Sequence, residues 1–373
     1  MEIINLTQHE DRPEGVLSGF RSIRGFLKSL IAQVRMHRIY RSAHLKQGIT
    51  LPKDLNASNS VLIAVPEGIV DSILCLPEVM EIINMNPEAS VSILCEEEVL
   101  PVFGGMNIIG SVYVYRNAEA EKHKYIWYEM GRRLSSEEFD ITFLLSPQPG
   151  KMLRFMVTAT LSRIRVGFAT AAGYPCCNLI IKNSSKKGMI EIISGSGNKR
   201  ALKLNLSEGK EKETELLFRE QHLSGENNRC GIDIEILRKR GRSGKNVEKM
   251  LEELENIGYT VYLYSYSGAE SDMKWVERLE RPFFSGLSIA GTAGVVQNSR
   301  LIISPAGVFA GIANISGVNT IMLTENEEKT RGFAEGDNFL IMEFNRLGSD
   351  QIESVVEAAE KFMKHEQSGE SEL

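Results

Sequence analysis

The chain has 373 residues and a mass of 41.7 kDa, which is too long for one ordinary core of about 100–200 residues, so two domains are expected. Its 42% hydrophobic and 25% charged residues exclude a disordered chain, and no apolar run approaches the ~20 residues that span a bilayer. The net charge of -6 excludes a dedicated nucleic-acid binder, because such proteins gain affinity by neutralising phosphates. An anionic ligand must therefore use a local basic patch.

The cysteines and histidines predict neither disulfides nor a metal site. The five cysteines include no Cys-x-x-Cys pair, so we expect buried free thiols, and the six histidines are too scattered to form a zinc site. We therefore predict no metal and no cofactor. The N-terminal sequence lacks the charged-then-apolar pattern of a secretory signal, which favours a reducing, cytoplasmic location.

Residues 1–57 are expected to form an N-terminal extension that carries an amphipathic helix at 15–46. Its apolar positions recur at helical spacing, and the remaining positions are basic without one acidic residue. The basic residues are Arg21, Arg24, Lys28, Arg35, Arg38, Arg41 and Lys46. Two interpretations stay open: the helix covers a domain, or it lies on an anionic membrane surface as a peripheral anchor.

Short aliphatic runs separated by helical ones predict a first Rossmann-like domain over 58–225. Its expected strands are 61–65, 90–95, 111–115, 140–145, 164–168 and 178–181. Residues 182–229 are polar and rich in Gly, Ser and Lys, which indicates a connector, although 213–222 within it has the pattern of a helix.

The alternation restarts over 226–347 and predicts a second Rossmann-like domain. Its expected strands are 231–236, 260–266, 300–304, 319–323 and 338–344, with helices at 247–257, 272–279 and 287–297. An amphipathic helix at 351–365 and a mobile tail are expected within 348–373. The predicted fold class is α/β, with two Rossmann-like domains facing across a cleft where the carboxyl edges of their sheets bind ligands.

Two segments of the second domain are candidates for binding phosphate. Pro305-Ala306-Gly307 links a strand to a helix, and such a turn presents unpaired backbone N–H groups, although many turns need glycine only for geometry. The second candidate is LRKRGRSGK at 237–245, with five cations in nine residues. It is expected either to clamp a diphosphate or to be a solvated basic loop.

Asp71 is the candidate catalytic residue of the first domain. It follows the first strand at an expected helix start, where it is either a general base facing the cleft or a carboxylate favoured by the helix dipole. Glu67 is the nearby alternative carboxylate.

Motifs spread over 58–345 follow the order of the motifs of a known family. The first is a strand, a turn, an Asp and a Pro six positions later, here Asp71 and Pro77. The others are FDITFLL at 139–145, IRVGF at 164–168, AAGYP at 171–175, the stretch from GIDIEI through Lys245 to Gly258-Tyr259, and residues 287–323. This pattern resembles glycosyltransferase family 9, which includes the lipopolysaccharide heptosyltransferases.

The sequence departs from the family in its donor-binding segment. The family reads Asp-Thr/Ser-Gly-x-x-His, and the matching positions here are Pro305, Ala306, Gly307, Val308, Phe309 and Ala310. We therefore expect backbone contacts to phosphate to remain available, and the side-chain contacts of the acid and the histidine to be lost. Val70 stands where the family has glycine before its Asp, and LTEN at 323–326 replaces a Gly-Pro-Thr.

The resemblance implies a GT-B fold and an inverting, metal-independent transfer of a heptose or similar sugar. The donor would be a nucleotide-diphosphate sugar and the acceptor a lipid-linked or cell-envelope saccharide. Asp71 would act as the base, with Glu67 and Gly68 on the acceptor side. The donor phosphates would contact Lys245, Arg242, Arg240, Ser243, Gly307 and Ala306. The alternative is a non-catalytic relative that binds or scaffolds; a dehydrogenase is disfavoured because no G-x-G-x-x-G opens either domain.

Overall fold

The computed structural model describes residues 2–6, 31, 34, 59–85, 87–103, 110–117, 124–168, 176–181, 208–240, 244–266, 276–325, 330, 333, 336–344 and 348–369. The chain divides into two compact units, 1–199 and 200–373. Helix α10 (Glu208–Glu220), which the sequence analysis assigned to the connector, therefore belongs to the second unit. It packs on α14 (Ile289–Gln297), where Gly294 leaves room for Thr214.

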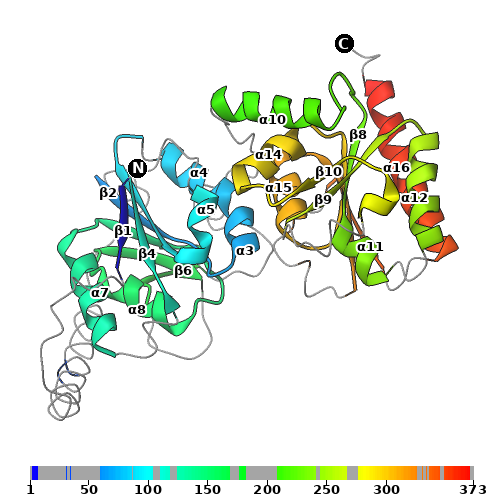
Figure 1. Ribbon diagram of the computed structural model, residues 1–373. Helices are drawn as coiled ribbons and strands as arrows, with labels where there is room; N and C mark the ends of the chain where they lie inside the picture. Colours follow the sequence, from blue (N-terminus) through cyan, green and yellow to red (C-terminus); the bar gives the residue numbers. More distant parts are fainter. Residues whose placement is uncertain are drawn as a thin grey trace, which may run out of the picture. The chain divides into compact units, whose positions relative to one another are not determined.

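The first unit is built on a seven-stranded parallel sheet (Figure 1). Its strands are β1 (Glu2–Asn5), β2 (Ser60–Ala64), β3 (Ser90–Glu96), β4 (Ser111–Tyr115), β5 (Ile141–Leu144), β6 (Ile164–Phe168) and β7 (Leu179–Ile181). The order β1-β4-β3-β2-β5-β6-β7 is the doubly wound order with one strand added beyond β4. The prediction that all of 1–57 lies outside the domain is wrong for β1, because these residues pair with β4 and the following Leu6 is buried.

Helices cover both faces of this sheet. They are α3 (Ile69–Leu74), α4 (Leu76–Met85), α5 (Leu100–Phe103), α7 (Lys124–Ser136) and α8 (Lys151–Ala159), with a 3₁₀ turn at Glu97–Val99. Leu62 and Ala64 of β2 pack with α7 and α8, while Val61 and Ile63 point to the opposite face because side chains alternate along a strand. Both faces are therefore apolar, which explains the uninterrupted run VLIAV.

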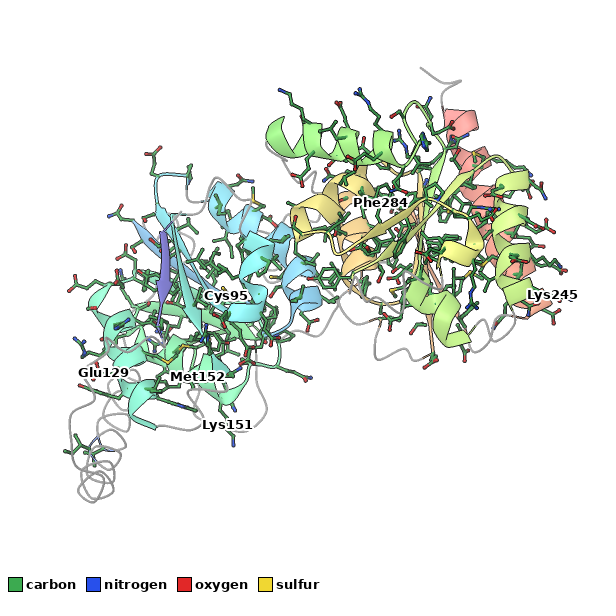
Figure 2. The ribbon with its side chains drawn as sticks, viewed as in Figure 1. Cys95, Glu129, Lys151, Met152, Lys245 and Phe284 are labelled. Carbon is green, nitrogen blue, oxygen red and sulfur yellow. The ribbon has the colours of Figure 1, made fainter. Side chains whose placement is uncertain are left out.

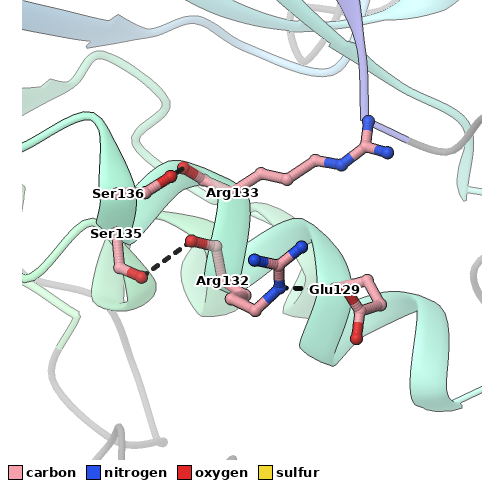
Figure 3. Close-up of polar contacts among 5 residues, drawn as sticks. All are labelled: Glu129, Arg132, Arg133, Ser135 and Ser136. Atoms are coloured by element: carbon pink, nitrogen blue, oxygen red, sulfur yellow. Dashed lines mark hydrogen bonds and ion pairs between the residues drawn. The ribbon is translucent and has the colours of Figure 1, made fainter.

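Helix α7 carries polar contacts along its exposed side (Figure 3). The Arg132 guanidinium donates to Glu129 one turn earlier, over 3.1 Å. The hydroxyls of Ser135 and Ser136 donate to the carbonyls of Arg132 and Arg133, which satisfies acceptors that the end of the helix leaves unpaired. The helix ends at Ser136, two residues before Glu138, whose backbone is left-handed (φ 52°).

The second unit is built on a six-stranded parallel sheet in the order β10-β9-β8-β11-β12-β13. Its strands are β8 (Arg229–Asp233), β9 (Thr260–Ser265), β10 (Phe283–Ser285), β11 (Leu301–Ser304), β12 (Asn319–Thr324) and β13 (Phe339–Glu343). Besides α10 and α14, its helices are α11 (Ile234–Arg240), α12 (Gly244–Asn256), α15 (Val308–Ser316) and α16 (Ser349–Gly369), with a 3₁₀ turn at Glu277–Leu279. Both units were predicted to be Rossmann-like, and among the described residues both have the doubly wound strand order of that fold.

Three expectations for the second unit need correction. The strand expected at 231–236 ends at Asp233, because its carboxylate accepts a hydrogen bond from the Glu235 N–H at 2.9 Å and so caps the helix that follows at once. Of the helix expected at 272–279, the structure describes 276–279, and Glu277–Leu279 form a 3₁₀ turn instead of an α-helix. The final helix continues to Gly369, into the expected tail.

Candidate functional site

In a doubly wound sheet, ligands bind outside the carboxyl ends of the strands at the point where the strand order reverses. That point lies between β2 and β5 in the first unit and between β8 and β11 in the second. In the first unit the β2–α3 turn carries Glu67 and Gly68, and Asp71 follows in α3. The predicted catalytic residue Asp71 and the predicted acceptor-side residues Glu67 and Gly68 therefore lie together at the expected edge.

Asp71 lies in the first turn of α3, whose N-cap is Gly68. Its side chain is exposed, but the surrounding protein displaces enough water from the carboxylate to raise its pKa above the ordinary value of 3.8. A Cβ on Gly68 would lie only 3.3 Å from the Asp71 Oδ2 atom, so the glycine leaves room for this carboxylate. A raised pKa suits a general base, since a more basic carboxylate takes a proton more readily.

Glu67 connects three elements around the reversal point. Its Oε2 accepts a hydrogen bond from the backbone N–H of Gly150, the N-cap of α8, at 2.7 Å, and its Oε1 accepts from the Tyr115 hydroxyl at 3.3 Å. Glycine at position 150 leaves room for this contact, because a Cβ there would lie 2.5 Å from the Glu67 carboxylate and would displace it. Both carboxylate oxygens are thus engaged, which favours a positioning role for Glu67 and leaves Asp71 as the candidate base.

The charge of Glu67 also affects its neighbours. Burial, and then the nearby carboxylates of Glu67 and Glu96, raise the pKa of Tyr115, so this hydroxyl stays a hydrogen-bond donor. Burial is likewise the main reason that the pKa of Glu96 is raised, with Glu67 adding to it. The carboxyl edge of the first sheet is therefore acidic.

At the reversal point of the second unit, Ala306 and Gly307 precede α15 as predicted. Gly307 is extended (φ -171°), and a Cβ on it would come no closer than 3.8 Å to another atom, so neither the backbone nor packing requires glycine. The N–H groups that open α15 have no side-chain cap. A glycine without a structural reason at a helix N-terminus leaves room for a ligand to approach the backbone.

Asp233 is a residue that the sequence analysis missed. It ends β8, is 8% exposed, and accepts a hydrogen bond from the Ser304 hydroxyl at the end of β11, at 3.3 Å. The run GIDIEI hid it because the whole run has the pattern of a strand. The sequence did contain one indication of Asp233, namely a charged residue near the end of the first strand predicted for this domain. Asp233 places a negative charge beside the turn that leads to Gly307.

The basic stretch does not form the loop that was expected. Residues 234–240 are helix α11, so Arg240 ends a helix, while Arg242 and Ser243 lie outside the described residues. Lys245 is exposed in the first turn of α12. Figure 2 shows it at the flank of the second unit, apart from α15. Phosphate binding by this stretch stays a prediction.

Further observations concern the thiols, the metal ligands and the membrane. All five cysteines are free and buried, as expected. Among the described residues, no three His, Cys, Asp or Glu side chains gather closely enough to hold a metal ion. Across those same residues, no helix combines the length and apolar character needed to cross a membrane. Within 15–46, only Ile31 and Val34 are described; both are helical, and 49% and 52% exposed.

The two strand orders define a doubly wound, two-unit α/β protein, the architecture of GT-B glycosyltransferases. No protein-family model and no curated protein matches the sequence. Among solved structures, the chain is similar to a glycosyl transferase family 9 protein of Veillonella parvula, with a TM-score of 0.66, 12% identity, and coverage of 82% of this chain and 98% of that chain.

Two Escherichia coli proteins are similar as well. ADP-heptose lipopolysaccharide heptosyltransferase II matches with a TM-score of 0.61 and 13% identity, over 83% of this chain and 99% of that chain. Heptosyltransferase WaaC, solved with ADP, matches with a TM-score of 0.59 and 12% identity, over 81% of this chain and 99% of that chain. The predicted resemblance to glycosyltransferase family 9 is therefore confirmed at the level of the fold.

Proposed function

We propose that this chain is a glycosyltransferase that moves a sugar, heptose or a related one, from a nucleoside-diphosphate donor to a saccharide or glycolipid acceptor. The main support is a fold that covers 98% of the Veillonella parvula family 9 protein, together with Asp71 beside the reversal point of the first sheet. One similar Escherichia coli protein is described as an ADP-heptose lipopolysaccharide heptosyltransferase, and the other was solved with ADP, which supports a donor of this type.

In the proposed reaction, Asp71 removes the proton from an acceptor hydroxyl as that oxygen attacks the anomeric carbon of the donor. The bond from this carbon to the diphosphate breaks on the opposite face, so the configuration inverts. The backbone N–H groups at the start of α15 would stabilise the charge on the leaving diphosphate. No step of this proposal requires a metal ion.

The donor site is tested by the substitution Gly307→Ala. Because glycine has no structural role there, we expect an unchanged melting temperature and at least a fivefold loss of affinity for nucleoside diphosphates. The measurement is calorimetric titration with nucleoside diphosphates and their sugar conjugates, including ADP-heptose. Lys245→Ala in parallel tests the basic stretch; equal affinities of Gly307→Ala and the native chain would remove the α15 turn from the donor site.

A second candidate function is that of a non-catalytic relative. It is favoured by Pro305 and Ala306 at positions where the family has polar side chains, and by Asp233, whose charge at the end of β8 opposes binding of a diphosphate nearby. For this function we expect no binding across the whole panel, with a chain that is folded by circular dichroism. The same titration therefore distinguishes the two functions.

We also propose that residues 15–46 attach the protein to the anionic cytoplasmic face of a membrane, where a glycolipid acceptor would lie. The basic positions and the exposed Ile31 and Val34 support this. Deleting 15–46 keeps β1 and leaves 7–14 and 47–58 as the connection to β2. We expect unchanged thermal stability and at least tenfold weaker co-sedimentation with vesicles containing anionic lipid. A lower melting temperature with unchanged vesicle binding would show that the segment packs on the protein.

A further inference from the structure

The serine that follows Asp71 in α3 connects this helix to the end of β2. Ser72 is fully buried, and its hydroxyl donates a hydrogen bond to the carbonyl of Pro66 at 2.8 Å. Its backbone N–H donates to the carbonyl of Gly68 at 2.9 Å. Ser72 therefore holds both ends of segment 66–68, which lies between β2 and α3.

The sheet and α8 hold the same segment from the other side. The Val65 N–H donates to the carbonyl of Leu94 in β3 at 3.1 Å, so the sheet pairing continues up to the residue before Pro66. The Glu67 carboxylate accepts from the N–H of Gly150 at 2.7 Å. Because the sheet, α8 and Ser72 all bind this segment, it is a firm support for a side chain that lies against it.

The Asp71 carboxylate is such a side chain. A Cβ on Gly68 would lie only 3.3 Å from its Oδ2 atom, so the carboxylate lies back over segment 66–68. Neighbouring side chains on a helix point about 100° apart, and accordingly Ser72 is buried in the unit while Asp71 is exposed. A hydrogen bond that fixes the rotation of α3 at Ser72 therefore also fixes the direction of Asp71.

Helix α3 depends on such a contact because it is short. It has six residues, and its N-cap, Gly68, provides no side-chain cap. Isolated helices shorter than about 12–15 residues are only marginally stable in water, so α3 is held by its surroundings. Its buried residues are Ser72 and Ile73. The apolar contact of Ile73 has no preferred direction, whereas the hydrogen bond of Ser72 does.

We propose that Ser72 is a positioning residue, which holds the Asp71 carboxylate against segment 66–68 in the place that proton transfer requires. The inference rests on the proposed function, in which Asp71 is the base that removes a proton from the acceptor hydroxyl. Ser72 itself contacts no reacting atom. Its effect on the rate is indirect, because a displacement of about 1 Å in a reacting group can lower a rate about 100-fold.

The first test follows the Asp71 carboxyl itself and needs no substrate. Carbon NMR of the chain with isotope-labelled aspartate carboxyls gives the titration midpoint of each carboxyl, and Asp71→Asn identifies the signal of Asp71. Partial burial raises the Asp71 pKa above 3.8 in the native chain. In Ser72→Ala the carboxylate is free to move into water, so we expect its midpoint to fall by about half a pH unit toward 3.8.

The matched control is Ser162→Ala, which also removes one buried hydroxyl from the first unit. Ser162 is 2% exposed, and its Oγ lies 2.6 Å from the Thr142 Oγ1 near the amino end of β5, at the opposite edge of the sheet from Asp71. We expect a lower melting temperature, comparable with that of Ser72→Ala, and a native midpoint for Asp71. The turn and the elements packed against α3 keep the same carboxylates in all variants, namely Glu67, Glu78, Glu81, Glu97 and Glu98.

The second test measures release of ADP from ADP-heptose with a lipopolysaccharide saccharide as acceptor. We expect kcat to fall about tenfold in Ser72→Ala while KM stays within about twofold, since the base is displaced and the binding surfaces are kept. Ser72→Thr keeps the hydroxyl and should recover most of the lost kcat. Ser162→Ala should turn over as the native chain does.

The two tests separate failure of this inference from failure of the proposed function. An unchanged Asp71 midpoint in Ser72→Ala would overturn the role of Ser72, whether or not the chain transfers sugar. Equal losses of kcat in Ser72→Ala and Ser162→Ala would do the same, because they would reflect lower stability alone. A native chain that releases no ADP counts against the proposed function, and the carboxyl titration then decides by itself whether Ser72 holds Asp71 in place.

Discussion

Asp71→Asn should lower kcat for sugar transfer by about 10²–10⁴-fold, the usual contribution of a general base, and leave donor affinity within twofold. The amide keeps the size and the place of the side chain in the first turn of α3 but cannot take a proton. In the native chain, kcat/KM should fall as the pH drops through the Asp71 pKa, which is raised above 3.8 by partial burial. Asp71→Asn should lose this acid limb.

The matched control is Glu88→Gln, which removes an exposed carboxylate from the turn before β3, at the opposite edge of the same sheet. We expect native turnover. Glu67→Gln separates the two carboxylates of the site: Glu67 bridges Gly150 and Tyr115, so its loss should lower the melting temperature as well as kcat. Native turnover by Asp71→Asn would exclude Asp71 as the base. Titration of the same variant with nucleoside diphosphates and their sugar conjugates would show separately whether the donor site is intact.

The largest expected effect on stability is that of Gly231→Ala. Gly231 lies in the middle of β8, and a Cβ there would lie 2.3 Å from the Tyr262 hydroxyl and 2.9 Å from the ring of Phe309. Both rings are buried, and the Tyr262 hydroxyl is fixed by a 2.7 Å hydrogen bond to Ser299, so neither moves without disturbing the core. Overpacking of this kind costs about 1–3 kcal/mol, and we expect the upper end of that range.

Urea unfolding followed by circular dichroism measures this effect as a lower midpoint with an unchanged slope. Gly307→Ala is the control for adding the same methyl group in the same unit, at a position with open space. It should unfold at the native midpoint. A native midpoint for Gly231→Ala would mean that the aromatic layer between β8, β9 and α15 adjusts at no cost, contrary to the close packing seen around Tyr262 and Phe309.

Much of the fold could be predicted from the sequence, because buried parallel strands need continuous aliphatic runs on both faces. The runs at 61–65, 90–95 and 111–115 became β2, β3 and β4 almost residue for residue. Two strands were missed for physical reasons. The short run EIIN becomes β1 only because distant β4 pairs with it, and the three residues of β10 carry too little periodicity to stand out.

The candidate site was predicted only in part. Asp71 and Gly307 could be found because each follows an aliphatic run at a strand-to-helix turn, a local pattern. The role of Glu67 could not, since its partner Gly150 is 83 residues away in the chain. Asp233 could not be singled out because it lies inside a run with the pattern of a strand. In the structure its carboxylate caps a helix that begins at the next residue, Ile234.

By itself the sequence determined that the chain forms two α/β units with parallel sheets, since hydrophobic periodicity is a local property that burial enforces. Only the tertiary structure decided which residues meet at the carboxyl edges, namely Glu67 with Gly150 and Tyr115, and Asp233 with Ser304. It also decided that the Lys245 side chain is exposed in the first turn of α12 and that the buried sulfurs of Cys176 and Cys177 lie 3.9 Å apart. The physical reason is that hydrogen bonds and charges act over a few ångströms in space, whatever their separation along the chain.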